Sequence, residues 1–264
     1  MLMQTDFSPI DHIEMTTLAQ MQRGGSWRMD TLHSYNDPIL YWITRGQGRM
    51  VVSGKMRGYG PSNAVFLPAK TMHSIDLGPQ CYGLAVTLPS DPLMTLPATP
   101  QQIRVANVPG QSELTGLLDN LQRELVSDRP AHTRAARFHA GLISVWLERN
   151  LPEPTKPDAA QRLVTRYCDL IEKRIDEGLN VEGYAAALDV TPTHLTRSTQ
   201  ACCAMSALEL LTERVTHAAR RRLTDTSMTI KAVSESLGFN SAAYFTRSFQ
   251  AQTGLTPSAF RDAA

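Results

Sequence analysis

The sequence has few cysteines, no excess of charge and no long apolar run, and each of these absences excludes a class of protein. Its four cysteines, Cys81, Cys168, Cys202 and Cys203, form no CxxC pair and no cluster with the spacing of metal ligands. We therefore expect no disulfide framework, no metal and no cofactor. No apolar run approaches the ~18 residues of a membrane helix. Because the N-terminus lacks a basic start followed by an apolar core, we expect no secretory signal, no membrane partner and a cytoplasmic location.

Charge of one sign is also missing. The chain has 26 Lys and Arg against 25 Asp and Glu, which gives a formal net charge of +1. Bulk charge therefore does not indicate a nucleic-acid partner, and any attraction to phosphate has to come from local arrangement. Apolar residues make up 42% and charged residues 19% of the chain, which is typical of a folded globular protein.

Along the 264 residues the pattern of apolar and turn residues changes twice, which predicts an α+β chain with more than one domain. Between residues 31 and 88, short apolar runs such as Tyr41–Thr44 and Ala64–Leu67 alternate with turn residues, as in a small β-sandwich or barrel. Helical spacing follows, and then Pro152, Pro154 and Pro157 favour an extended connector. We expect a β-rich domain at 1–110, a helical dimerisation or packing segment at 111–150, a proline-rich linker at 151–157 and an all-helical domain at 158–264.

Two apolar stripes run along the segment at 111–150. The first consists of Leu114, Leu117, Leu118, Leu121 and Leu125, and the second of Phe138, Leu142, Val145 and Trp146. Residues three and four apart share one helix face, so each stripe predicts an amphipathic helix. The first stripe, from Leu114 to Leu125, fits packing on the β-rich domain, which we favour, or a helix–helix contact in a homodimer; two heptads are too few to decide.

The strongest signal is an internal repeat. Residues 195–201, LTRSTQA, recur fifty positions later as residues 245–251, FTRSFQA, with five of seven positions identical. Asn180 and Thr229 can cap the helix before each copy, and Thr191 and Ser241 can cap the helix that carries it. The repeat therefore predicts two helix-turn-helix units, the second helix of which typically enters a DNA major groove.

The equivalent arginines of the two copies, Arg197 and Arg247, are our main candidates for DNA contact. Between the units, Ala207–Leu223 predicts one helix of ~25 Å, so both units could reach successive major grooves. A lone exposed arginine is more often solvated, but two at equivalent places favour recognition of guanine edges. We expect the remaining contacts with double-stranded DNA from Thr193, Thr196 and Thr246 (base edges), Ala242 and Ala243 (thymine methyl groups), and Gln200 and Gln250 (phosphates).

From Asp158 to Ala264 the chain resembles the AraC/XylS family of bacterial transcription regulators, most clearly between Ile230 and Arg261. The first unit departs from the family pattern at Thr199, Ala204 and Ala207. The resemblance implies a sequence-specific regulator, not an enzyme, that activates transcription through RNA polymerase and responds to a small-molecule effector bound by the N-terminal domain. Some departures resemble the subgroup that controls catabolism of hydroxylated aromatic acids, which makes an aromatic acid a candidate effector.

The β-rich part resembles a cupin barrel more loosely. Gly46-Gln47-Gly48 is similar to the turn after an early strand, and Pro68…His73 to the second cupin motif, with Lys70 in place of the usual glycine. His33 and Tyr35 stand where the family's metal-binding members have paired histidines, and no suitably spaced Glu follows, which argues against a metal.

Small barrels enclose pockets, so we expect the effector site there. The candidate pocket residues are His33, Tyr35, Trp42, Thr44 and His73, with ordinary core or surface positions as the equally weighted alternative. Two further functions stay open from sequence: a cupin-type metal enzyme with a DNA-binding tail, and a DNA-binding protein without effector control.

Overall fold

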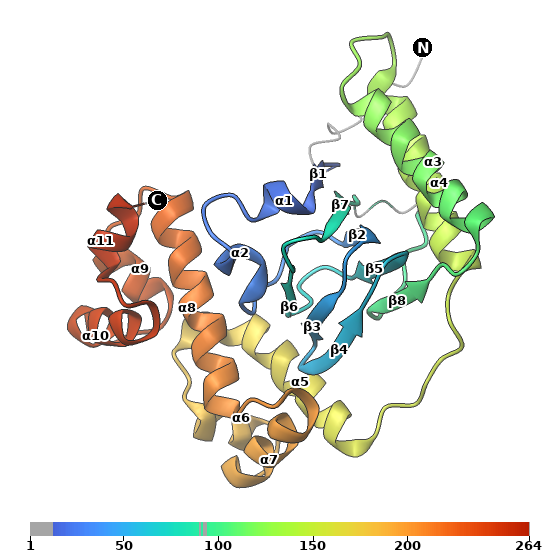
Figure 1. Cartoon of the computed structure of the whole chain (residues 1–264). Coiled ribbons are helices and arrows are strands. Elements are labelled where there is room, and N and C mark those ends of the chain that lie inside the picture. The colour runs from blue at the N-terminus through green and yellow to red at the C-terminus, as the bar shows by residue number, and fades with distance from the viewer. Residues whose placement is uncertain (1–12, 90, 92–93, 264) are drawn as a thin grey trace, which may run out of the picture.

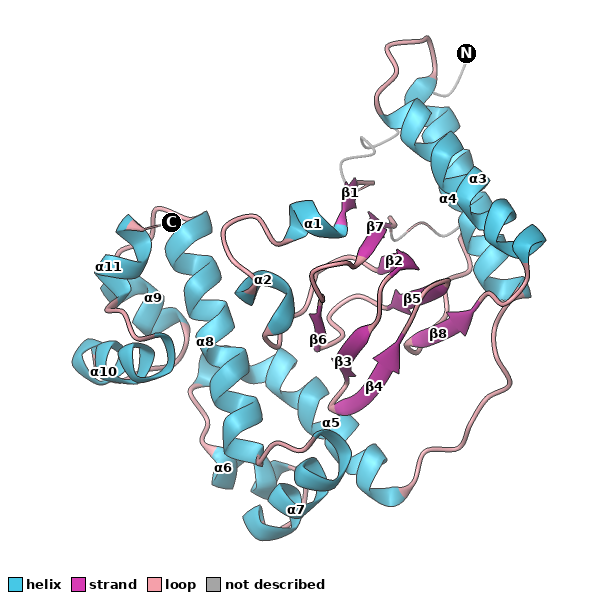
Figure 2. Ribbon diagram, in the orientation of Figure 1, coloured by secondary structure: helices cyan, strands magenta, loops and turns pink. Residues whose placement is uncertain are grey.

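The computed structural model describes residues 13–89, 91 and 94–263. The N-terminal segment that lacks the pattern of a secretory signal lies outside the described residues. Strands occupy the first half of the chain and helices the second (Figures 1 and 2), which confirms the predicted α+β, multidomain fold class. None of the helices in this described part combines the length and the apolarity that crossing a bilayer requires.

In the described part of the chain, eight strands form two antiparallel sheets. The five-stranded sheet has the order β1 (Met15–Thr17), β7 (Tyr82–Thr87), β2 (Ile39–Arg45), β5 (Asn63–Leu67) and β8 (Gln101–Arg104). The three-stranded sheet has the order β4 (Lys55–Tyr59), β3 (Gly48–Val52) and β6 (His73–Asp76). Two short helices, α1 (Leu18–Met21) and α2 (Trp27–Asp30), connect β1 to the loop before β2.

The two sheets do not close into a barrel, so the prediction of a closed barrel was wrong. No strand ladder within the described residues joins β4, the edge of the smaller sheet, to β8, the edge of the larger one. The side chain of Gln102 in β8 instead donates a hydrogen bond of 2.8 Å to the carbonyl oxygen of Gly58 in β4. A side-chain bridge between two edge strands leaves an open seam, because backbone groups are not paired along it.

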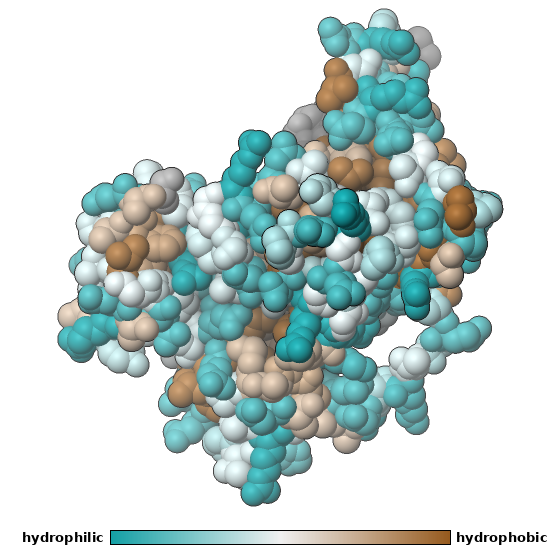
Figure 3. Space-filling view, in the orientation of Figure 1, coloured by the Kyte–Doolittle hydropathy of each residue, from teal (hydrophilic) through white to brown (hydrophobic). Residues whose placement is uncertain are grey.

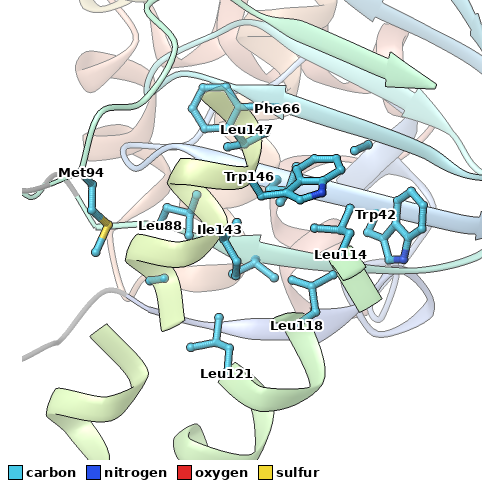
Figure 4. Packing of buried hydrophobic residues seen from close by; sticks show 14 of the residues in the cluster. Trp42, Phe66, Leu88, Met94, Leu114, Leu118, Leu121, Ile143, Trp146 and Leu147 are labelled. Carbon is cyan, nitrogen blue, oxygen red and sulfur yellow. The ribbon is translucent and has the colours of Figure 1, made fainter. Parts of the chain in front are cut away.

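Strand β2 is buried on both faces, which explains its continuous apolar run. Ile39, Tyr41 and Ile43 pack in the core between the two sheets. Leu40 and Trp42 point the other way, into a second core formed with the helices that follow β8. Figure 4 shows Trp42 in this second core, beside Leu114.

These helices, α3 (Val108–Leu125) and α4 (His132–Arg149), pack as a hairpin against the larger sheet (Figure 1). Leu114, Leu118 and Leu121 of α3 are buried, so the first predicted stripe packs into the core. Of the second stripe, Trp146 is buried, whereas Phe138, Leu142 and Val145 are 65%, 50% and 36% exposed. The face of α4 that meets the core consists instead of Ala136, Ala140, Ile143, Ser144, Trp146 and Leu147.

No regular secondary structure is assigned to residues 150–158, which lead into the helical half. The helices that follow are α5 (Ala159–Arg174), a short 3₁₀ turn η1 (Ile175–Glu177), α6 (Val181–Ala187), α7 (Pro192–Cys203), α8 (Ala207–Asp225), α9 (Ile230–Ser236), α10 (Ala242–Thr253) and α11 (Pro257–Asp262). Asp158 caps α5 by accepting a hydrogen bond from the Gln161 backbone N–H. The domain boundaries given above remain a prediction.

Contacts between the two halves, among the described residues, include the following two. At the first, the β3–β4 turn packs on α5, and Gly54 (φ +69°) sits so close that a Cβ there would lie 2.2 Å from Val164 Cγ1. At the second, the Trp27 ring of α2 lies 5.3 Å from the His217 ring of α8. Only glycine tolerates both the left-handed backbone and the close contact with Val164, so the packing of the β3–β4 turn on α5 depends on Gly54.

Candidate nucleic-acid interface

The first helix-turn-helix unit consists of α6 and α7. The Asn180 side chain accepts a hydrogen bond from the Gly183 N–H at the start of α6, and Thr191 does the same for the His194 N–H at the start of α7. Between the helices, Asp189 adopts φ +58°, a left-handed conformation that costs a non-glycine residue about 1–2 kcal/mol. The caps and the tight turn agree with the sequence prediction.

The second unit, α9 and α10, repeats this arrangement. Thr229 caps α9 through the Ala232 N–H, and Ser241 caps α10 through the Tyr244 N–H. Gly238 occupies the turn with φ +72°, at the place equivalent to Asp189. The fifty-residue sequence repeat therefore corresponds to a structural repeat.

The second helices of the two units present equivalent faces. Leu195 of α7 and Phe245 of α10 are buried, and Arg197 and Arg247, two residues further on, are exposed. In the described part of the chain neither guanidinium has an ion pair or a hydrogen bond. All nine predicted DNA-contact residues are accessible from solvent: Thr193, Arg197, Gln200, Ala242, Ala243, Arg247 and Gln250 are exposed, and Thr196 and Thr246 are half-buried. Their contact with DNA stays a prediction.

The three consecutive arginines at the end of α8 contact other groups of the protein, unlike Arg197 and Arg247. Arg222 donates to the backbone oxygen of Ser236 in α9 at 2.6 Å. Arg221 pairs with Asp225 on the same helix. The Arg220 guanidinium lies 5.6 Å from the Trp27 ring centroid, over a residue of the β-rich half. These cations are therefore engaged by protein groups, in contrast to those on α7 and α10.

Two features hold the units in a fixed relation. They lie at opposite ends of α8 (Figure 1), which belongs to the cores of both. In addition, the backbone at Gly178, after η1, meets the turn of the second unit at Gly238: a Cβ added to Gly178 would lie 2.1 Å from the Gly238 carbonyl oxygen. Both residues have positive φ, so glycine is required there for conformation as well as for space.

Three of the five predicted effector residues come together at the contact between the two halves. The His33 ring centroid lies 4.2 Å from that of His73, 5.1 Å from that of Tyr35 and 4.9 Å from that of His217 in α8. The Tyr41 hydroxyl lies 2.9 Å from His73 Nε2. We call His33, His73 and His217 the histidine cluster. Its members pack against one another and are almost fully buried.

Burial lowers the pKa of every member of the histidine cluster. Desolvation brings the pKa of His73 to about 4 and that of His217 to about 3, with Arg214 adding to the effect at His217. The pKa of His33 is also lowered well below its usual value, first by desolvation and then by the other two histidines. His33 Nε2 is buried without a hydrogen-bond partner. The cluster is therefore neutral in the folded chain near pH 7.

The other two predicted effector residues lie elsewhere. Trp42 packs under α3 and donates from Nε1 to the Thr115 hydroxyl at 3.2 Å. Thr44 is exposed near the end of β2, and its hydroxyl donates to the Tyr82 carbonyl oxygen at 3.1 Å. Within the described residues no group of three or more His, Cys, Asp or Glu side chains is arranged to hold a metal ion.

Sequence reasoning missed His217, the member of the histidine cluster that the helical half contributes. It lies on the face of α8 that meets the β-rich half, and no local pattern marks a contact between residues 184 positions apart such as His33 and His217. Tyr41 was missed as well, although its alternation with Ile39 and Ile43 along β2 could have placed it between the sheets.

The comparisons with known proteins agree with the repeat. A family model described as a helix-turn-helix domain matches residues 184–263. The bifunctional transcriptional activator/DNA repair enzyme AdaA of Bacillus subtilis is 30% identical over 99 residues, which are 38% of this chain and 46% of that protein. The uncharacterized HTH-type transcriptional regulator YfiF of the same species is 29% identical over 129 residues, which are 47% of this chain and 40% of that protein.

Among solved structures, ToxT of Vibrio cholerae with bound unsaturated fatty acid aligns over 96% of each chain with 15% identity and a TM-score of 0.42. This chain spans less than half the length of the two Bacillus relatives. The residues that the family model matches, 184–263, include most of both helix-turn-helix units. The C-terminal part of this chain therefore contains a helix-turn-helix domain, as the internal repeat predicted.

Proposed function

We propose that this chain is a cytoplasmic transcription regulator that binds specific sites in double-stranded DNA through α7 and α10. The observation that carries the proposal is the pair of exposed arginines, Arg197 and Arg247, at equivalent places on two capped helices and without acidic partners among the residues that the structure describes. A desolvated arginine–guanine pair requires a guanidinium that is not already engaged by a carboxylate.

The length of α8 supports binding to two successive major grooves. Its 19 residues span about 28 Å at 1.5 Å each. With the width of the units at its ends, the separation of α7 and α10 becomes comparable to the ~34 Å turn of B-DNA.

The test compares Arg247→Ala, Arg197→Ala and the control Lys231→Ala, an exposed cation on α9, on an operator selected from random DNA. For each arginine variant we expect a loss of about 10- to 100-fold on the selected site and relaxed preference at one base pair. Lys231→Ala should keep that preference. An equal loss on every sequence, in fluorescence anisotropy titrations at two salt concentrations, would make the arginines phosphate contacts and refute base recognition.

Effector control is the second part of the proposal. It is supported by the contact of the β-rich half with α8, since a ligand that changes this half can act on the helix joining the two DNA-binding units. The candidate effector residues remain His33, Tyr35, Trp42, Thr44 and His73, with an aromatic acid as one candidate ligand. A small molecule that raises the melting temperature and changes operator affinity would support this part; a constitutive factor would show neither change.

We further propose that the regulator activates transcription through RNA polymerase, a role that the name of the relative AdaA supports. In vitro transcription with purified polymerase is the measurement that decides between activation and repression. We propose no enzymatic activity for the chain. Stoichiometric iron, manganese or zinc in the purified protein would instead favour the alternative of a cupin-type enzyme.

The exposed face of α4 supports a homodimer. Phe138, Leu142 and Val145 form an apolar stripe on the side of α4 turned away from the core, and apolar atoms reach the surface over the α3–α4 hairpin (Figure 3). A two-fold symmetric pair would bury the same stripe of both copies. Leu142→Glu should then shift the protein from dimer to monomer in sedimentation velocity, while Val126→Glu, an exposed apolar site after α3, should leave it unchanged.

A further inference from the structure

A cleft of about 790 Å³ lies at the seam where the two sheets fail to close. Its walls come from β4, the start of β8, the proline-rich linker and the first turns of α5. Figure 1 shows where these elements lie. A volume of this size suits a small organic ligand, for which pockets usually measure about 300–1,000 Å³.

Two cations of β4 line this cleft. Lys55 and Arg57 stand two residues apart, so they share a face of the strand with the buried Tyr59. Both are half-buried, and neither has an ion pair in the described part of the chain. Arg57 Nε is buried and has no hydrogen-bond partner. No acceptor among the described residues holds the Arg57 guanidinium at this atom.

The remaining walls are apolar or uncharged, with one exception. Val52, Leu151 and Pro152 offer apolar surface, and Gln101 and Gln102 offer amide groups. The exception is Glu153 of the linker, which is exposed to solvent and makes no ion pair with either cation in the described residues. The cleft therefore combines a positive end with an apolar wall.

We propose that this cleft binds the carboxylate of a small organic acid with an apolar body, which is then the effector of the regulator. Arg57 and Lys55 hold the carboxylate, since the planar guanidinium fork matches its two oxygens. The apolar body lies against the linker, on Leu151 and Pro152. This inference rests on the proposed effector control, and it places the ligand outside the histidine cluster.

The cleft is lined in part by α5 of the DNA-binding domain, so a ligand bound there contacts both halves of the chain. Its walls include Gln161 and Thr165 of α5, and Val164 of the same helix touches the β3–β4 turn at Gly54. The core of α5 packs with α7. A ligand that bridges β4, the linker and α5 stabilises one arrangement of the two halves over others, which is the requirement for effector control.

The experiment uses the full chain with octanoate and benzoate as probes, and octanamide, benzamide and inorganic phosphate as matched compounds. At about ten times its dissociation constant, an acid should raise the melting temperature by about 3 °C, and the amide of the same shape should not. Arg57→Gln and Lys55→Gln should each weaken binding about 10- to 100-fold in calorimetric titrations. Arg49→Gln, an exposed cation on the neighbouring strand β3, is the control and should bind like the wild type.

Three results would overturn the inference: no stabilisation by either acid at millimolar concentration, equal stabilisation by acid and amide, or stabilisation by phosphate alone. An acid that binds Arg57→Gln and the wild type equally would also overturn it. Thr155→Trp, which fills the cleft from the linker and keeps both cations, should abolish binding and so serves as a second variant if Arg57→Gln does not fold. Operator binding is measured on the same wild-type sample: loss of DNA binding there refutes the proposed function, whereas DNA binding without any response to the acids refutes only the cleft.

Discussion

Acidification from pH 7 to pH 5 should strongly destabilise the fold, because the histidine cluster is buried in its neutral form. In the unfolded chain each histidine takes up a proton near pH 6.5. In the folded chain His73 and His217 do so only near pH 4 and pH 3. Unfolding therefore binds protons between these values, and the free energy of unfolding falls as the pH falls through this window.

The magnitude follows from the width of the window. Between pH 6.5 and pH 5 each neutral buried histidine costs about 2 kcal/mol of stability, at about 1.4 kcal/mol per pH unit. His73 and His217 together give about 4 kcal/mol, and His33 adds to this in the same direction. The charges around the cluster do not cancel the effect: Arg214 lowers the pKa of all three histidines, and the opposing influence of Glu172 on His73 is smaller than desolvation. This is a large part of the 5–15 kcal/mol that typically holds a domain folded.

Urea unfolding followed by tryptophan fluorescence between pH 5 and pH 7 measures the effect, with Trp27 reporting from its contact with His217. The wild type should lose at least about 3 kcal/mol per pH unit below pH 6, from His73 and His217, and His217→Asn about 1.4 kcal/mol less, because one proton fewer is bound on unfolding. His194→Asn, a change at an exposed site on α7, is the control and should keep the wild-type slope. A wild-type slope near zero, or a slope that His217→Asn leaves unchanged, would refute the reasoning.

Three further predictions concern stability and are checked by chemical or thermal denaturation. Ala204 ends α7 with φ +58°, where the second unit has Gly254, so Ala204→Gly should stabilise the chain by about 1 kcal/mol; a loss of stability would contradict the repeat. Arg214→Met should cost about 3–5 kcal/mol, because it removes the cation paired at 2.6 Å with the buried carboxylate of Glu172 and leaves it only the Ser34 hydroxyl, and adding Glu172→Leu should restore most of the loss. Gly54→Val should destabilise by at least about 2 kcal/mol through its contact with Val164, whereas Gly116→Ala, in open space on α3, should gain up to about 1 kcal/mol.

The helix-turn-helix units could be predicted from sequence because local chemistry determines them. Asn180, Thr191, Thr229 and Ser241 cap helices within three residues of themselves, and the repeat doubles the evidence for each. The exposed side of α7 and α10 follows from the burial of Leu195 and Phe245 at helical spacing.

Features that depend on contacts between distant segments could not be predicted in this way. Helix α4 has two apolar arcs, and periodicity does not tell which arc meets the core. The buried arc combines the small residues Ala136 and Ala140 with the large side chain of Trp146, and only packing against the sheet shows that these sizes fit the core. The open seam at β4 and β8 and the pairing of His33 with His217 likewise arise only when segments far apart in the chain meet.

The meeting of Gly178 and Gly238 has a consequence for the shape of the operator. With the backbone that precedes the first unit in close contact with the turn of the second, and with α8 continuous between the units, the distance from α7 to α10 has little freedom to adjust. On a site whose two halves are one base pair too close or too far, the duplex itself has to bend or change its twist, and the cost depends on how deformable the intervening steps are. The bases between the half-sites, which the protein does not touch, would then contribute to the choice of site through their stiffness.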